Sequence, residues 1–340
     1  MSLSEVIARM DAEARRKLEK KLPSWAGAGV TVPASLNLEQ CSSEATALYK
    51  AGLIPPGSRV ADLTGGLGAD SWAFSRRASA VWYNERNSSL METVRTNFAS
   101  LGVPNVVFNS YDISPEAGAW SDSLKAFAPD VIYLDPARRS ASGSKVFLLE
   151  ECSPDVTALL PLLLDTAPKV MIKVSPMADL TMLRRRLSGA ISELHIVGSA
   201  GECKELLCIC TRNAGDCRTV LSEDGHILDC AEWTEQPDGP MLFVPSAVLT
   251  KSGLGPGMRL MDFDATLAHF GRFWQVIENL PFASSVLKSL GQRYPQAEVT
   301  ARGVPISSDE LSKKLKVKPG GDIHIFACLL SGQRRLLVCR

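Results

Sequence analysis

The chain has 340 residues, a length that fits two domains or one large α/β domain with an appendage. With 45% hydrophobic and 22% charged residues, its composition is typical of a globular protein and excludes disordered, collagenous and coiled-coil classes. Lys and Arg total 37 and balance 37 Asp and Glu, so the charge of the whole chain gives no sign of a polyanionic partner.

The charge is uneven along the chain. Residues 284–340 carry ten Lys or Arg against four Asp or Glu, a net charge of +6. Such a basic terminal module suits a phosphate backbone, although a basic surface that serves only solubility is at least as common. The first residues are charged throughout, and no apolar run is long enough for a membrane span. We therefore expect a cytoplasmic protein without a membrane segment.

The cysteines and histidines give little sign of a metal site. Nine cysteines are an odd number, which argues against a disulfide framework. The densest group is Cys203, Cys208, Cys210 and Cys217, whose spacing does not form paired CxxC motifs. We favour thiols of a buried strand over a zinc or iron–sulfur site. The four histidines form no HxxxH pair. We expect no metal.

Helical and β-rich stretches alternate through the first two thirds of the chain. A charged amphipathic helix is predicted over residues 2–21, before Pro23, and a second over 39–51. Further stretches of helical period include 88–101 and 145–164. The β-rich runs are RVADL (59–63), AVWYN (80–84), NVVFN (105–109), DVIYLD (130–135), KVMIKV (169–174), ELHIVG (193–198) and ELLCIC (205–210). This alternation predicts a parallel, doubly wound sheet whose ligand site lies at the carboxyl ends of the strands.

The pattern changes after Arg212. Hairpin-like segments follow, with turns predicted at 224–226 and 331–333 and a short basic helix at 311–316. This predicts a second, α+β region, and we place an internal division near Pro281.

A glycine-rich loop follows the first predicted strand in VADLTGGLGAD, residues 60–70. A strand that ends in a carboxylate and continues into glycines allows the backbone to approach a nucleotide closely. A dinucleotide site would place its pyrophosphate at the start of the next helix. The acidic Asp70 occupies that place, so the pattern favours a cationic nucleotide without phosphate.

The segment DLTGGLGAD resembles the first motif of class I S-adenosylmethionine-dependent methyltransferases, D/ExGxGxG. Asp62, Gly66 and Gly68 match it, whereas Thr64 stands where the first glycine is expected and Gly65 is extra. The family has an acid after the second strand for the ribose hydroxyls and another near the end of the third for the adenine amino group. The residues that the resemblance assigns to S-adenosylmethionine are Asp62, Thr64, Gly65, Gly66, Gly68, Asp70, Glu85, Asp112 and Ile113.

The fourth predicted strand ends in LDPARR, residues 134–139, where this superfamily keeps its catalytic loop. Methyltransferases that act on exocyclic amines carry D/NPPY/F there, and Asp135 and Pro136 match while Ala137 and Arg138 do not. The catalytic candidates are therefore Asp135, Pro136 and Arg138. The alternatives are a helix cap for Asp135 and a surface position for Arg138.

The tetrad DPAR occurs in a different branch, the 5-methyluridine RNA methyltransferases, which attack the base with a cysteine that follows the fifth strand. Here KVMIKV is followed by Ser175, and no cysteine lies between Cys152 and Cys203. An unactivated serine is a poor substitute for a thiolate. Methylation of carbon is thus disfavoured, and transfer to nitrogen or oxygen remains.

Two further polar segments have two interpretations each. Gln40, Ser42 and Ser43 precede the first strand, where they could close the methionine end of a cofactor or cap a helix. The charged residues in GECKELL could line the site or form a weak ion pair at its rim, which we favour. They are Glu202, Lys204 and Glu205.

Together, LEQCSSEATALYK, VADLTGGLGAD, YLDPARR and GECKELL resemble bacterial class I methyltransferases with a ferredoxin-like segment and a C-terminal THUMP-like domain. The resemblance implies an α/β fold with a Rossmann-like seven-stranded methyltransferase sheet, an N-terminal helical extension and a C-terminal α+β region. The implied boundaries are 1–38 for the extension, 39–212 for the methyltransferase domain, 213–280 for the ferredoxin-like segment and 281–340 for the THUMP-like domain.

THUMP domains bind RNA, which is consistent with the basic C-terminal region. The first hypothesis is therefore an S-adenosylmethionine-dependent methyltransferase that acts on a base nitrogen of tRNA or rRNA. A small-molecule methyltransferase is the second, and it predicts a sealed acceptor pocket and no affinity for RNA. A non-catalytic RNA-binding protein with a degenerate core is the third, which Thr64 and the missing aromatic of DPAR leave open.

Overall fold

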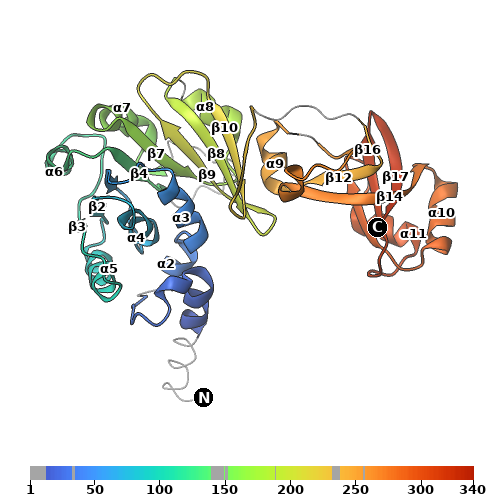
Figure 1. Cartoon of the computed structure of the whole chain (residues 1–340), viewed down its shortest axis with the longest axis horizontal. Helices are drawn as coiled ribbons and strands as arrows, with labels where there is room; N and C mark the ends of the chain where they lie inside the picture. Colours follow the sequence, from blue (N-terminus) through green and yellow to red (C-terminus); the bar gives the residue numbers. More distant parts are fainter. Residues whose placement is uncertain are drawn as a thin grey trace, which may run out of the picture. The chain divides into compact units, whose positions relative to one another are not determined.

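The computed structural model describes residues 13–32, 35–138, 149, 152–187, 189–231, 238–255 and 257–340. The chain divides into two compact units (Figure 1). The first comprises Met1–Val197 and Lys204–Gly225, and the second Gly198–Cys203 and His226–Arg340. Within the described ranges, no helix combines the length and apolarity needed to cross a membrane.

The larger sheet is mixed and has the strand order β11-β10-β8-β9-β7-β4-β1-β2-β3; all of its strands except β11 lie wholly or mainly in the first unit, which ends at Gly225. The strands are β1 Arg59–Asp62, β2 Ala80–Asn84, β3 Val106–Asn109, β4 Val131–Leu134, β7 Lys169–Val174, β8 Ile191–Ser199, β9 Glu202–Cys210, β10 Arg218–Glu223 and β11 His226–Asp229. Strands β3, β2, β1, β4 and β7 run parallel, so their carboxyl ends share one edge of the sheet.

All seven predicted strands are present, but the sheet differs from the prediction in two ways. Strand β9 runs antiparallel to β7, because Ala200 and Gly201 alone join it to β8, both with positive φ of 54° and 78°. Two residues can close a hairpin but cannot form the long crossover that a parallel pair requires. In addition, β10 and β11 extend the edge of the sheet, so residues 218–223, beyond the predicted boundary at 212, belong to it.

Helices alternate with the strands, and polar side-chain caps fix where four of them begin. They are α2 Ser35–Gln40, α3 Glu44–Gly52, α4 Ala69–Ser75, α5 Ser88–Ser100, α6 Ala119–Phe127, α7 Val156–Thr166 and α8 Leu180–Arg186. Asn87, Asp155 and Asp179 cap α5, α7 and α8 through bonds to backbone N–H groups. The single helix predicted over 39–51 is instead two helices, because Ser43 caps α3 by accepting from the Thr46 N–H.

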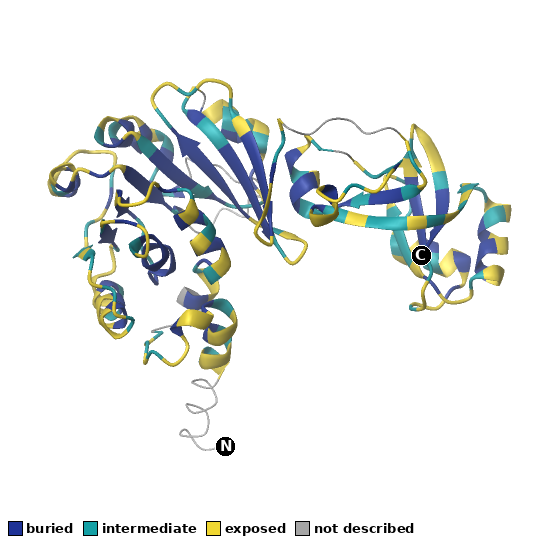
Figure 2. Cartoon of the chain, in the orientation of Figure 1, coloured by how far each residue is buried: buried dark blue, intermediate teal, exposed yellow. Residues whose placement is uncertain are grey.

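The N-terminal extension packs onto the core of the first unit. Residues 13–21 are helical and lead into the 3₁₀ helix η1 Pro23–Trp25. The Trp25 side chain is fully buried, and its ring lies edge-on to Trp72 at 6.0 Å and to Phe98 at 6.3 Å. The extension is therefore part of the same hydrophobic core as α4 and α5. Figure 2 shows this core as the dark inner strands and inward helix faces.

The second unit is built on a six-stranded sheet with the order β13-β12-β14-β17-β16-β15. Its elements are β12 Met241–Pro245, α9 Ala247–Ser252, β13 Arg259–Met261, the 3₁₀ helix η3 Leu267–His269, β14 Gly271–Pro281, α10 Ser284–Arg293, β15 Glu298–Arg302, α11 Ser308–Leu315, β16 His324–Leu330 and β17 Gln333–Cys339. Leu287, Leu290 and Leu311 bury α10 and α11 against the sheet residues Ile325 and Leu336.

The predicted local features of this unit are present. The turns predicted at 224–226 and 331–333 are tight, with positive φ at Asp224, Gly225, Ser331 and Gly332, and the short basic helix lies within α11. The sheet is continuous across the boundary placed near 280, since β14 lies between β12 and β17. Finally, β5 Ala137–Arg138 and β6 Cys152–Ser153 form a two-stranded sheet after β4.

Candidate functional site

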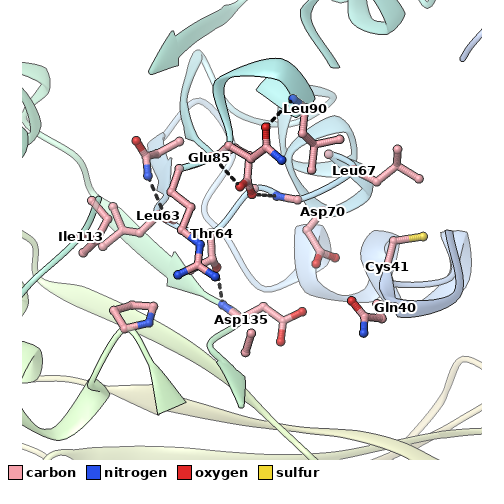
Figure 3. A pocket seen from close by; sticks show the side chains of 18 of the residues that line it. Gln40, Cys41, Leu63, Thr64, Leu67, Asp70, Glu85, Leu90, Ile113 and Asp135 are labelled. Carbon is pink, nitrogen blue, oxygen red and sulfur yellow. Dashed lines mark hydrogen bonds between the residues drawn. The ribbon is translucent and has the colours of Figure 1, made fainter. Parts of the chain in front are cut away.

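A cavity of about 860 Å³ opens where the loops after β1, β2, β3, β4 and β7 meet α2. Its volume is that of a pocket for a small molecule or cofactor. The predicted site residues that line it are Thr64, Gly65, Gly66, Gly68, Asp70, Glu85, Asp112, Ile113 and Asp135. In Figure 3, Glu85 and Leu90 lie on one side of the cavity, and Asp70, Asp135 and Gln40 lie on another side. The carboxyl edge of the sheet thus gathers residues from the ends of five strands.

Asp62 lies behind the glycine loop rather than in the cavity wall. Its side chain is 1% exposed and accepts hydrogen bonds from Ser71 Oγ at 2.6 Å and from the Thr64 N–H at 3.1 Å. Burial raises the pKa of Asp62 to about 7, against the lowering effect of these two bonds. Asp62 therefore holds the glycine loop in place from the protein interior.

The extra glycine of the loop has a steric reason. A Cβ on Gly65 would lie 2.1 Å from the ring of Tyr83, whose hydroxyl donates to the Gly66 carbonyl at 2.6 Å. Gly66 and Gly68 adopt left-handed conformations with φ of 52° and 88°. The loop backbone therefore packs on a tyrosine of β2 and presents no side chains of its own at these positions.

Thr64, the departure from the glycine motif, joins the loop to the end of β4. Its Oγ1 accepts a hydrogen bond from the Asp135 N–H at 2.6 Å (Figure 3), and its own N–H donates to Asp62. A glycine could not make the first of these bonds. The threonine is thus a structural link between the cofactor-type loop and the predicted catalytic loop.

Glu85 and Asp112 occupy the part of the cavity beyond β2 and β3. Glu85 accepts from the N–H groups of Gly66 at 3.1 Å and Asn87 at 2.8 Å, which fixes its carboxylate beside the loop. Asp112 is exposed toward the cavity, and Ile113, 8% exposed, forms an apolar wall next to it. Two carboxylates flanking an apolar wall suit hydroxyl and amino donors of a nucleoside.

A buried ionic cluster supports the opposite side of the cavity. Lys50 on α3 is fully buried, and its Nζ lies 2.8 Å from Glu205 Oε1 and 3.1 Å from Asp70 Oδ1. Ser42 Oγ and Tyr133 OH each donate to Asp70 Oδ2 at 2.8 Å. Burial is the largest single influence and would raise the pKa of Asp70, but the Lys50 and Lys173 ammonium groups, together with the hydrogen bonds from Tyr133 and Ser42, hold that pKa below its usual value. Asp70 is therefore a paired carboxylate.

The cluster corrects the interpretation of GECKELL. Glu205 is 3% exposed and holds Lys50 through both oxygens, so it is not part of a rim ion pair. The burial of Glu205 was not predicted, because the sequence pattern indicated a parallel β9. Glu202 and Lys204 are exposed. Lys50 itself was missed, since one lysine in an amphipathic helix gives no sign of burial.

The alternatives for the segment before β1 are now distinguished. Gln40 and Ser42 line the cavity, and Ser42 also bonds to Asp70. Ser43 caps α3. Of the three candidates, two thus lie at the cavity and one has a purely local role.

Asp135 forms a second ion pair, with a residue that the sequence analysis missed. Lys173 Nζ lies 2.6 Å from Asp135 Oδ2, and the two side chains are 15% and 34% exposed. Burial lowers the pKa of Lys173, but the charges of Asp135, Asp70 and Glu205 outweigh it and raise that pKa overall. The available signal was a lysine inside the otherwise apolar run KVMIKV.

Other predicted site residues do not line the cavity or cannot be placed. Pro136 is buried and lies outside the lining. The side chain of Arg138, and Arg139 altogether, lie outside the described residues. Ala137 and Ser175 do line the cavity.

Of the four clustered cysteines, Cys203, Cys208 and Cys210 lie in β9, whereas Cys217 lies outside the strands. None of the nine cysteines forms a disulfide, and burial raises the pKa of Cys210 to about 12. In the part of the chain that the structure describes, no group of three or more His, Cys, Asp or Glu side chains is arranged to hold a metal ion.

Comparisons with known proteins agree with this architecture. Residues 271–340 match the family described as THUMP domain-like. A crystal structure from Porphyromonas gingivalis W83, provisionally named a methyltransferase, is 29% identical, covers 96% of this chain and 88% of its own, and has a TM-score of 0.82. Precorrin-6y C5,15-methyltransferase from Geobacter metallireducens GS-15 is 17% identical over 49% of this chain and 86% of its own, with a TM-score of 0.34. No curated protein sequence matches the chain. The similarity to the Porphyromonas gingivalis structure confirms the predicted α/β fold class with its Rossmann-like sheet.

Proposed function

We propose that this chain, a methyltransferase-fold protein with a C-terminal THUMP-like domain, is an S-adenosylmethionine-dependent enzyme that methylates a base nitrogen of tRNA or rRNA. The observation that carries the proposal is the cavity at the carboxyl edge of the sheet. There, the glycine loop after β1 lies beside carboxylates that follow β2, β3 and β4.

The charge of the cavity favours a cationic nucleoside. Its described lining has four carboxylates and two cationic side chains, so its net charge is negative; these are Asp70, Glu85, Asp112 and Asp135 with Arg86 and Lys173. The two ion pairs already described occupy Asp70 and Asp135, which leaves Glu85 and Asp112 as the carboxylates nearest the loop without a cationic partner among the described residues. A diphosphate is disfavoured beside such a surface.

The residues fit the cofactor on structural grounds, because Gly65, Gly66 and Gly68 line the cavity and put no side chain between the loop backbone and a ligand. Glu85 would accept from the ribose hydroxyls and Asp112 from the adenine amino group, with Ile113 against the purine. Gln40 and Ser42 would contact the methionine end. When bound, S-adenosylmethionine supplies a methyl group activated by its sulfonium.

Asp135 would hold the acceptor. One carboxylate oxygen, Oδ2, is engaged by Lys173, and the backbone N–H is fixed by Thr64. The carboxylate would accept from the N–H of the acceptor amine and align its lone pair with the methyl group. Placement of the two reactants supplies most of the rate gain in this scheme.

The RNA partner is inferred from the second unit. Lys313 and Lys314 on α11, with Lys316 and Lys318 just after it, are all exposed. By contrast, Arg293 is bound to Glu278 and Arg335 to Asn279. Four exposed lysines within six residues present a surface that a phosphate backbone would neutralise.

Mass spectrometry of nucleosides tests the proposal. RNA from a strain that lacks this gene is expected to miss one methylated nucleoside, which reappears when the wild-type chain is supplied but not its Asp135→Ala variant. An unchanged nucleoside profile would remove RNA as the substrate. If the chain still bound S-adenosylhomocysteine in that case, the small-molecule alternative would be favoured, and absence of binding would favour a non-catalytic protein.

A further inference from the structure

Lys173 lies beside Asp135, the residue predicted to hold the methyl acceptor. The register of the sheet places it there. Strands β4 and β7 are parallel neighbours, with Leu134 paired to Ile172. Asp135 and Lys173 are the next residues along each strand, so they emerge side by side at the carboxyl edge. Both line the cavity.

The Asp135–Lys173 ion pair is energetically unfavourable to desolvate. The Lys173 side chain is only 15% exposed, and placing an ammonium group there is unfavourable unless carboxylates compensate. Asp135 does so at 2.6 Å, and the charges of Asp70 and Glu205 add to the attraction. Lys173 therefore stays an ammonium ion and cannot act as a base.

Asp135 is held from two sides. Thr64 Oγ1 fixes its backbone N–H at 2.6 Å, and Lys173 fixes Oδ2. Among the residues that the structure describes, none donates a hydrogen bond to the other oxygen, Oδ1. One carboxylate oxygen is thus immobilised and the other is presented to the cavity.

We propose that Lys173 is a positioning residue of the transfer reaction, which holds the Asp135 carboxylate so that a single oxygen faces the acceptor and the sulfonium. This inference rests on the proposed function. In transfer to an amine, the nitrogen lone pair forms the new N–C bond, the C–S bond breaks and leaves its electron pair on sulfur, and the amine proton passes to water. The pair contributes geometry to this step, and the nearby ammonium reduces the excess negative charge of the site.

The charge of Lys173 gives a readout that needs no acceptor. S-adenosylmethionine carries a cationic sulfur, whereas S-adenosylhomocysteine is neutral there, so the ratio of their affinities reports the charge at the transfer position. Removing a cation from this position should favour the cationic ligand by roughly three- to tenfold relative to the neutral one. Removing the carboxylate should change the ratio in the opposite direction.

The experiment compares Lys173→Met, Lys173→Arg, Asp135→Asn and the control Lys169→Met, which removes a lysine from the same strand outside the cavity. Calorimetry gives both affinities, and methyl transfer is measured with RNA from the deletion strain. We expect Lys173→Met to lower kcat at least tenfold and raise the affinity ratio toward S-adenosylmethionine. Lys173→Arg should largely restore both, and Lys169→Met should change neither.

Folding is controlled with the double variant Asp135→Asn/Lys173→Met, which removes both charges and should unfold less readily than Lys173→Met alone. Equal transfer rates and equal affinity ratios for wild type, Lys173→Met and Lys173→Arg would overturn the inference. If the wild type binds both ligands but methylates no RNA, the RNA part of the proposed function fails, while the affinity ratio still decides the role of Lys173. If the wild type binds neither ligand, both fail together.

Discussion

Two lysines at the cavity of the first unit and four lysines near α11 of the second unit are held in opposite ways. In the first, Lys50 is buried and the Lys173 side chain is 15% exposed, and the Nζ of each lies within 3.1 Å of a carboxylate oxygen. In the second, the lysines of α11 and the segment after it are exposed to solvent. Buried and paired charges fix the positions of neighbouring groups, whereas exposed charges remain available to a polyanion.

The comparison distinguishes residues that position groups for the reaction from residues that contribute affinity for RNA. Precise placement at the cavity depends on buried pairs, whose loss costs folding free energy and is little affected by salt. Recognition of a long phosphate backbone depends on exposed charges, whose loss costs little stability and whose effect falls with salt. The predictions that follow test this division, beginning with the largest effect.

Breaking the buried cluster should have the largest effect on stability. Lys50→Met leaves Asp70 and Glu205 buried without their cation, and we expect a loss of about 3–5 kcal/mol in the free energy of unfolding. Urea denaturation measures it. Adding Glu205→Gln to the variant should recover part of the loss, because one uncompensated charge is removed. A change below 1 kcal/mol, on the scale of a surface pair, would show that the buried charges do not support the cavity.

Filling the space at Gly65 should damage the loop. In Gly65→Ala the new methyl group would lie 2.1 Å from the Tyr83 ring, so we expect a loss of about 3 kcal/mol in the free energy of unfolding and much weaker cofactor binding. Gly52→Ala is the matched control, because a Cβ there meets nothing within 4 Å.

Adding Tyr83→Leu to Gly65→Ala should restore part of the stability, since it removes the ring that the methyl group meets. Wild-type stability and cofactor affinity in Gly65→Ala alone would contradict the close approach of the loop to β2.

Asp62 should make stability depend on pH. Its pKa of about 7 in the folded chain is above its ordinary value of 3.8, so the folded state binds the proton more tightly than the unfolded state. Stability should therefore fall as pH rises from about 4 to about 7, by about 1.4 kcal/mol for each unit in that range.

Denaturation at about pH 5 and pH 8 in the wild type and in Asp62→Asn measures this contribution. The variant should lose less stability over that interval, by about 2.6 kcal/mol. Identical pH profiles would mean that Asp62 is not desolvated.

The smallest effect on stability is expected in the second unit, where RNA affinity should change instead. Replacing the four lysines near α11 by glutamine should leave the free energy of unfolding almost unchanged. It should make the slope of log affinity against log salt less negative by roughly 0.7 to 0.9 for each lysine that contacts a phosphate. The variant changes Lys313, Lys314, Lys316 and Lys318 together.

The matched control removes the same charge from exposed residues of the first unit, and it changes Arg15, Arg16, Lys20 and Lys125. An equal loss of RNA affinity in both variants would show that binding follows net charge and not the lysines of the second unit.

Much of the fold followed from local patterns. Alternating apolar runs predicted all seven strands, and the glycine turns marked the hairpins. The direction of β9 was predicted wrongly, because it depends on a two-residue turn at Ala200 and Gly201 in which the first residue is not a typical turn former. The extension of the sheet by β10 depends on pairing between strands, which periodicity does not report.

Positions of site residues that directly follow a strand could be predicted from the sequence. Positions that depend on the packing of distant segments were missed. The acids after successive strands, such as Glu85 and Asp135, meet at one cavity because parallel strands share an edge. Lys50 and Glu205 lie 155 positions apart, and only the packing of α3 against β9 brings them together. Thr64 was interpreted as a defect in a motif, whereas it bonds to the chain after β4.

Calorimetric titration with S-adenosylmethionine tests the central claim most directly. We predict one saturable site in the wild-type chain and binding that is at least tenfold weaker in Glu85→Ala, whose lost carboxylate lies beside the glycine loop. If neither S-adenosylmethionine nor S-adenosylhomocysteine binds, or if a dinucleotide with its diphosphate binds in their place, the cavity is not a methyl-transfer site.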